Sequence, residues 1–486
     1  MNVQTRKTTL TAVAILLLIA VVQVWIISAG QWWSWPTYSD DYSRLADGFL
    51  RGRLGLMVEP PPQLLALPNP YDAIANRRYR WNDALLFNGK YYLYWGPVPA
   101  LLIAAVCWPL RISMPDFGDQ YIVFAALLGT VVCSAILIWC IRRQLFPQQK
   151  SQTAAVAIVS LGLGTPVMYL LGRAAIYEAA IAAGQFFLVL GVLLAFLALT
   201  RPRRAVMFMA GASVSLALSA GSRISLAPAV AAIAIATLSY LLRRHQRPVA
   251  IAAALVLPLV LSAAIFAWYN DARFGSIIEF GHRYQLAAAG YDAQSPAFLA
   301  IHQIVPNLYD YLFAAPMRLN TFPYVWAYRQ RPWMADFFGI PHRFAYEPVV
   351  GLAWSQPFLI FALLAIFVRR AATETALSTW LTLALVGGAV FGFAPAVSMD
   401  ICTMRYLLDA VPCLTILAAI GYWRVLSRFS HDSRGPREIW SAARLAVGWQ
   451  SFLGILLAVS GYYGQFSTFN PALLHALHSF FPKVVL

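Results

Sequence analysis

The sequence predicts an all-α polytopic membrane protein. Of its 486 residues, 60% are hydrophobic and only 12% are charged, whereas a soluble protein carries roughly 25% charged residues. Apolar runs close to the length of about 20 residues that a helix needs to cross a bilayer recur along the whole chain. A soluble enzyme, a disordered chain and a disulfide scaffold are therefore excluded. About 11 transmembrane helices are expected, over 9–29, 120–141, 153–171, 178–199, 205–221, 225–241, 248–268, 349–368, 376–396, 405–423 and 446–466.

The segment 97–112 is apolar but too short to span a membrane. At about 1.5 Å per residue it reaches about 24 Å, less than the roughly 30 Å of hydrocarbon, and Pro97 and Pro109 bracket it. We therefore expect a juxtamembrane helix that lies on or dips into the outer leaflet. The first run, 9–29, is longer than the apolar core of a signal peptide and predicts an uncleaved anchor.

The arginine clusters between the spans support this placement. If 97–112 does not cross, every cluster lies on the N-terminal side, as the positive-inside rule favours for the cytoplasm. We therefore expect a multi-pass membrane protein with a cytoplasmic N-terminus. The net charge of +16 arises from residues that punctuate the apolar runs, so no nucleic-acid partner is expected. The clusters lie at 142–143, 201–204, 243–247, 369–370 and 424–444.

Two long, aromatic-rich segments remain on the outer side, so an active site is expected in the periplasm. The first loop, 30–96, and the helix 97–112 belong to an N-terminal transmembrane module, 1–268. The second loop covers 269–348, and 349–486 holds the C-terminal transmembrane helices and a periplasmic tail. The loops on the opposite side are short connectors.

The first outer loop opens with an acidic pair, Asp40-Asp41. Adjacent carboxylates repel, which raises a pKa and suits a general base. The pair could equally share a divalent cation through its oxygen atoms. A structural role is as well supported, because Asp40 suits a helix N-cap and Asp41 the first turn. The sequence leaves open whether a metal binds and which aspartate is the base.

Four arginines at outer helix ends run against the charge bias of the chain. An arginine at this depth is costly unless it snorkels or meets an anion, and its planar fork suits a phosphate group. The alternative for each is a lipid headgroup or a nearby acid, such as Glu178, Asp271 or Asp409. The four are Arg173, Arg223, Arg273 and Arg405.

These motifs together resemble the GT-C-fold glycosyltransferases, and in particular a subgroup of uncharacterised bacterial members. The acidic pair is followed by Tyr42 and by an Ala-x-x-Phe-Leu-x-Gly helix, as at the start of those enzymes. Further similar stretches are 88–99, before the family's juxtamembrane helix, Gly221-Ser222-Arg223, Asn270 to Gly275 with Glu279 to Gly281, and Met404-Arg405-Tyr406.

The resemblance implies an inverting enzyme of the bacterial inner (cytoplasmic) membrane. Such an enzyme moves a sugar from a polyprenyl-phosphate carrier to a periplasmic-side lipid or glycan acceptor. Asp41 or Asp40 would be the general base, while Arg273 and Arg405, with Arg173 or Arg223, would bind the donor phosphate. Other expected substrate contacts are Tyr42, Lys90, Tyr92, Glu178, Glu279 and Tyr406.

Two other kinds of membrane protein fit the same features. A lipid-linked sugar transporter or flippase would use the arginines without a base. An O-antigen ligase or polymerase-like enzyme would depend on the loop 269–348 rather than on the first loop. The sequence does not name the sugar, the acceptor, a cofactor or the oligomeric state.

Overall fold

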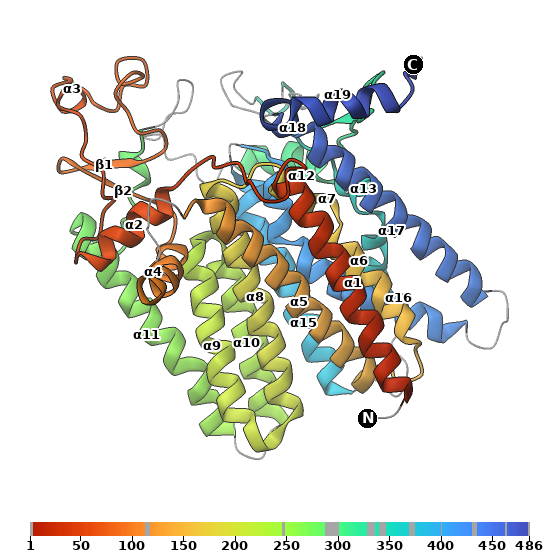
Figure 1. Ribbon diagram of the computed structural model, residues 1–486. Helices are drawn as coiled ribbons and strands as arrows, with labels where there is room; N and C mark the ends of the chain where they lie inside the picture. Colours follow the sequence, from red (N-terminus) through yellow and green to blue (C-terminus); the bar gives the residue numbers. More distant parts are fainter. Residues whose placement is uncertain are drawn as a thin grey trace.

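The long apolar segments form a bundle of helices that run between two ends of the molecule (Figure 1). The computed structural model describes residues 3–111, 117–244, 248–286, 301–327, 336–339, 347–368, 375–399, 401–429, 435–461 and 464–484. The longer helices of the described chain are α1 (Val3–Ile27), α5 (Asp119–Leu145), α8 (Ile176–Thr200), α9 (Ala205–Ser222), α10 (Ala227–Arg244), α11 (Pro248–Phe274), α15 (Ala376–Ser398), α16 (Val411–Arg428) and α17 (Gly435–Ser460).

Within the described ranges, eight helices are long and apolar enough to cross a membrane. A bent pair, α6 (Ser151–Gly162) and α7 (Thr165–Leu171), makes a ninth span if its two halves are taken together. The chain is thus an all-α, multi-pass membrane protein, as the composition predicts.

Two of the expected spans take another form. The segment 349–368 is broken into α13 (Leu352–Ser355), the 3₁₀ helix η6 (Pro357–Leu359) and α14 (Ile360–Phe367). Pro357 has no amide hydrogen and disfavours helical geometry at the residue before it, which explains the break. The segment 405–423 begins with the 3₁₀ helix η7 (Met404–Asp409), so α16 starts only at Val411.

The first outer loop leaves the bundle and returns to the same end of it. The Gln120 side chain, at the start of α5, donates a hydrogen bond to Thr37 Oγ1 (2.8 Å), and the Asp119 amide donates to the Ser39 carbonyl (3.0 Å). Because α1 ends and α5 begins at this one end, α4 (Val98–Leu110) does not cross the bundle. We call this end the outer end.

Both long loops and the C-terminal segment meet at the outer end (Figure 1). The first loop forms α2 (Asp41–Leu50), α3 (Pro62–Leu65) and a hairpin of β1 (Leu85–Phe87) and β2 (Lys90–Tyr92). The second contributes α12 (Ile304–Phe313) and a ribbon of β3 (Met317–Arg318) and β4 (Val325–Trp326). The hairpin contacts the second loop through a bridge between Leu85 and Gln285. The chain ends in α18 (Gln465–Phe469) and α19 (Pro471–Phe480).

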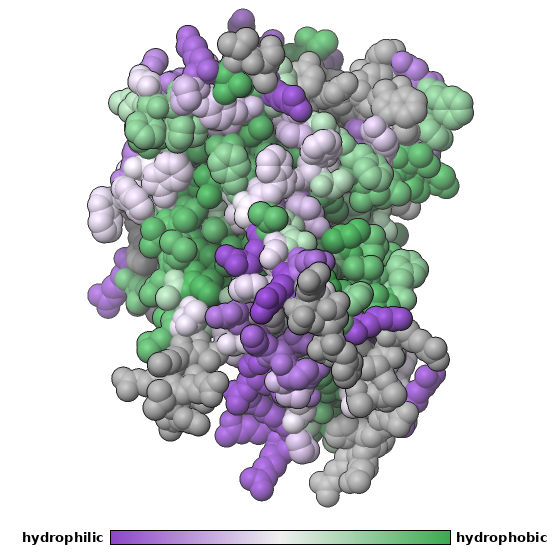
Figure 2. Space-filling model, turned by 90° about the vertical axis from the view of Figure 1, so that its right-hand side faces the viewer, coloured by the Kyte–Doolittle hydropathy of each residue, from purple (hydrophilic) through white to green (hydrophobic). Residues whose placement is uncertain are grey.

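Arginine-rich turns occupy the opposite end, which we call the basic end. Arg142 and Arg143 lie in the last turn of α5, and Arg203 and Arg204 in the 3₁₀ helix η2 (Pro202–Arg204) between α8 and α9. Figure 2 shows hydrophilic surface gathered toward the lower part of the face that carries α17, with apolar surface above and beside it. This distribution is typical of a protein whose middle is surrounded by lipid.

Gly96 fixes the first loop against the bundle. A Cβ at this position would lie 1.9 Å from the Gly221 carbonyl oxygen, so only glycine allows this approach of the two backbones. Gly221 lies two residues before Arg223, at the end of α9. The contact therefore sets the position of the first loop relative to an arginine of the expected site.

We predict that Gly96→Ala destabilises the protein by at least about 2 kcal/mol, because backbone atoms must move to accept the methyl group. The measurement is the thermal unfolding of the detergent-solubilised protein. Gly448→Ala is the matched control, since a Cβ there meets no atom within 4 Å. Equal unfolding temperatures for Gly96→Ala and the wild type would contradict this role of Gly96.

Candidate functional site

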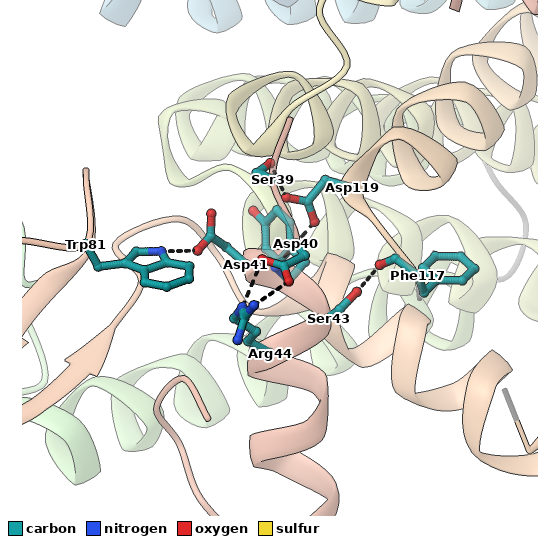
Figure 3. A network of polar contacts seen from close by, with 9 residues as sticks. Ser39, Asp40, Asp41, Ser43, Arg44, Trp81, Phe117 and Asp119 are labelled. Carbon is teal, nitrogen blue, oxygen red and sulfur yellow. Dashed lines mark hydrogen bonds and ion pairs between the residues drawn. The ribbon is translucent and has the colours of Figure 1, made fainter. Parts of the chain in front are cut away.

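A buried carboxylate stands at the start of α2. Asp41 is 8% exposed, and its Oδ1 accepts a hydrogen bond from the Trp81 indole N–H at 2.6 Å (Figure 3). No hydrogen bond to Oδ2 is found within the described residues. Two neighbours in the helix, Tyr42 and Leu45, are fully buried and hold this face of α2 against the rest of the protein.

Asp40 has a different environment from Asp41. It occupies the N-cap position of α2, but its carboxylate makes no capping hydrogen bond. Instead it pairs with Arg44 one turn later through two short contacts, Nε–Oδ1 at 2.9 Å and Nη2–Oδ2 at 2.7 Å. The Arg44 guanidinium also lies over the Trp81 ring, 4.9 Å from its centroid. Asp40 is thus neutralised by a cation, and Asp41 is not.

Burial raises the pKa of Asp41 from 3.8 to about 6. The Trp81 hydrogen bond lowers this pKa, and the negative charges of Asp40 and Asp83 raise it further. A carboxyl group with a pKa near neutrality is suited to accept a proton during a reaction. Of the two adjacent aspartates, the environment of Asp41 fits a general base better.

Asp119, at the start of α5, is a third acid beside this pair (Figure 3). It is fully buried and accepts hydrogen bonds from the Tyr42 amide (3.3 Å) and the Ser39 hydroxyl. The sequence does not single out Asp119 as a site residue. It directly precedes the expected span 120–141, and an acid at the start of a helix is also favoured by the helix dipole. Its position alone therefore does not distinguish a functional role from a structural one.

Asp83, a fourth acid, connects this group to the arginines. Its backbone has φ +63°, in the left-handed region. The Tyr177 hydroxyl donates to one carboxylate oxygen at 2.7 Å, and the Gln285 amide donates to the other at 3.1 Å. The Tyr177 ring in turn lies under the Arg405 guanidinium, 4.5 Å away. Asp83 has no local sequence signal, because its partners lie 94 and 202 residues away.

Three of the four expected arginines gather near the starts of α8 and η7. Arg405 holds Glu347 at 2.8 Å and lies 3.8 Å from Glu178. Arg173 lies 3.6 Å from the same Glu178 oxygen. Arg223 forms a buried pair with Asp409 at 2.8 Å. Tyr406 lies under two of these cations, 4.8 Å from Arg223 and 5.6 Å from Arg405.

Arg273 has a different setting. Its guanidinium donates to the Leu93 carbonyl at 2.7 Å and to the Asn270 side chain at 2.8 Å. It also lies 3.9 Å from the centroid of the Tyr269 ring. These contacts fasten the end of α11 to the first outer loop. A role of Arg273 in phosphate binding remains a prediction from the sequence.

The other expected substrate contacts fall into two groups. Tyr42, Glu178 and Tyr406 are buried beside the acids or the arginines. Within the described residues, the Tyr42 hydroxyl and Glu178 Oε2 have no hydrogen-bond partner. The second group has other contacts: Tyr92 packs on the Phe274 ring, Lys90 is exposed next to the hairpin turn, and Glu279 pairs with Arg283 and accepts from the Gly281 amide.

Among the described residues, no three His, Cys, Asp or Glu side chains lie close enough together to hold a metal ion. The side chains of the acidic pair also diverge, Asp40 toward Arg44 and Asp41 toward Trp81 (Figure 3). A cation shared by these two carboxylates would have to displace the Arg44 guanidinium from Asp40. The divalent cation considered from the sequence remains a prediction.

No known protein family and no curated protein matches the sequence. Three solved structures of the oligosaccharyltransferase from Archaeoglobus fulgidus are similar in fold. One is tethered to an acceptor peptide with an NVT sequon (12% identity, TM-score 0.46, 93% of this chain and 55% of that chain). Another is in complex with an inhibitory peptide and a dolichol-phosphate (12% identity, TM-score 0.43, 98% and 56%). The third is the apo form (13% identity, TM-score 0.45, 93% and 56%).

The chain spans a little over half the length of that enzyme.

We predict that Asp41→Asn stabilises the fold at pH 8 by at most about 3 kcal/mol, since the pKa of Asp41 rises from 3.8 to about 6 and each unit is worth about 1.4 kcal/mol. The folded protein binds this proton more tightly than the unfolded chain does. The charged form is therefore destabilising above pH 6, and this cost disappears as the pH falls from 6 toward 4.

Thermal unfolding at pH 8 and pH 4 measures the effect. Asp47→Asn is the control, because Asp47 belongs to an exposed pair with Arg51 and is expected to change stability by no more than about 0.5 kcal/mol. If Asp41→Asn is less stable than the wild type at pH 8, the charged Asp41 carboxylate does not destabilise the folded protein, which would contradict the prediction.

Proposed function

We propose that this chain is an integral membrane glycosyltransferase that moves a sugar from a polyprenyl-phosphate carrier to a lipid or glycan acceptor at the outer end of the bundle. The observation that carries the proposal is Asp41, a buried carboxylate with a pKa of about 6 that is held by Trp81 and influenced by the charge of Asp83. Asp83 in turn is bound by Tyr177, whose ring lies under Arg405. A base and a set of cations at the same end of the protein are the two parts that this reaction needs.

Asp41 is the general base in this proposal. Trp81 holds Oδ1, so Oδ2 is available to accept the proton of the acceptor hydroxyl as its oxygen attacks the anomeric carbon. The new bond forms between that oxygen and the anomeric carbon, while the bond from carbon to the phosphate oxygen breaks. The electron pair leaves with the lipid phosphate. Attack from the face opposite to the phosphate inverts the anomeric centre.

The arginine cluster would stabilise the leaving group. Charge develops on the phosphate oxygen as the bond breaks, and fixed cations nearby lower the energy of that transition state. Arg405, Arg223 and Arg173 stand at the ends of helices whose sides are apolar. A lipid phosphate at this depth would leave its prenyl tail along those helices.

The charge distribution supports a periplasmic location for this site. The arginine-rich turns lie at the basic end, and cytoplasmic loops of membrane proteins carry the excess of Lys and Arg. In a bacterial inner membrane the outer end would then face the periplasm, and α4 would lie at the outer leaflet.

Replacement of the base tests the proposal. Asp41→Asn is expected to lower the rate of sugar transfer from a polyprenyl-phosphate donor by about 10²- to 10⁴-fold, while binding of the donor is retained. Asp47→Asn, the exposed control, is expected to keep the wild-type rate. Undiminished transfer by Asp41→Asn would remove its role as base, and retained carrier translocation without any sugar transfer would favour a flippase.

The pH dependence provides a second test. A general base works only when deprotonated, and burial raises the pKa of Asp41 to about 6. The transfer rate at saturating donor is therefore expected to rise with pH up to about 6 and then to level off. An initial-rate series from pH 4.5 to 8 measures this, and a rate that falls over the same interval would contradict the assignment.

A further inference from the structure

The fork of Arg405 is occupied by a carboxylate from the second outer loop. Nη1 lies 2.8 Å from Glu347 Oε2, and Nη2 lies 3.0 Å from Oε1. This two-point arrangement is also the way in which a guanidinium holds a phosphate. The remaining nitrogen of this guanidinium, Arg405 Nε, is buried and has no hydrogen-bond partner among the described residues. A phosphate, which has more oxygens than a carboxylate, could use that position as well.

The backbone of Glu347 is fixed, but its side chain is the most accessible of the acids in this group. The Glu347 amide donates to the Cys402 carbonyl at 3.1 Å, and the Met404 amide donates to the Pro348 carbonyl at 3.3 Å. The Glu347 side chain is 19% exposed, compared with 4% for Glu178. A change of rotamer can therefore release Arg405 without any movement of the backbone.

Glu347 and an incoming phosphate would compete for the same atoms. Both would use the two terminal nitrogen atoms of Arg405, which Glu347 now holds through both of its carboxylate oxygens. An anion can therefore bind at this fork only after the Glu347 carboxylate has left it.

We infer that Glu347 occupies the place of the donor's phosphate and is displaced when the donor binds. The inference rests on the proposed function, because it assigns the phosphate of that donor to the fork of Arg405.

Binding of a synthetic lipid tests this without catalysis. The probe is a hexose farnesyl phosphodiester, titrated into the full chain in nanodiscs at pH 7.5.

Removal of the competing carboxylate tests the displacement. Glu347→Gln is expected to bind the phosphodiester about tenfold more tightly than the wild type, because the neutral amide releases Arg405 more easily. The variant is expected to fold, because Arg405 keeps Glu178 as an anionic neighbour at 3.8 Å. Thermal unfolding of the variant checks this. The matched control is Glu59→Gln, which makes the same change in a side chain that is 84% exposed and is expected to leave affinity unchanged.

Unchanged or weaker binding by a folded Glu347→Gln would overturn the displacement. The outcome is separable from the test of the proposed function. If the wild type transfers sugar but Glu347→Gln binds no more tightly, this inference fails and the transferase stands. If Glu347→Gln binds more tightly but Asp41→Asn transfers at the full rate, the displacement stands and the role of Asp41 fails.

Discussion

The structure of the outer end depends on one constraint, that charges buried in a membrane protein need partners. Arg223 with Asp409 and Arg405 with Glu347 meet this need in pairs. Asp41 has no such partner among the described residues, since its carboxylate accepts a hydrogen bond from Trp81 but has no cation in direct contact. Burial of this carboxylate raises its pKa to about 6. The feature that makes Asp41 costly to the fold also makes it useful as a base.

The packing of the outer loops maintains this arrangement. Gly96 brings the end of the first loop onto the backbone of Gly221, and Arg273 binds the Leu93 carbonyl. Asp83 joins the first loop to α8 through Tyr177 and to the second loop through Gln285. These contacts thus hold the first loop against α8, α9, α11 and the second loop at the outer end.

The sequence predicted the features that depend on local pattern. Long apolar runs required membrane-spanning helices, short arginine-rich turns indicated the basic end, and the position of Asp41 after the first span indicated a candidate base. The break at Pro357 was missed because the apolar composition of 349–368 continues across it. Composition alone does not show where a proline divides a span. Asp119, Asp83 and Glu347 were missed for another reason, since each acquires its role from partners that only the fold brings near.

The central claim is that Asp41 and the arginine cluster act on opposite sides of one anomeric carbon. An experimental structure of the Asp41→Asn protein with a bound hexose prenyl phosphodiester tests this most directly. Our account predicts the phosphate oxygens on Arg405, the Glu347 side chain turned away, and the sugar between the phosphate and residue 41. A phosphate bound elsewhere, with Glu347 still on Arg405 and the side chain at position 41 far from the sugar, would contradict it.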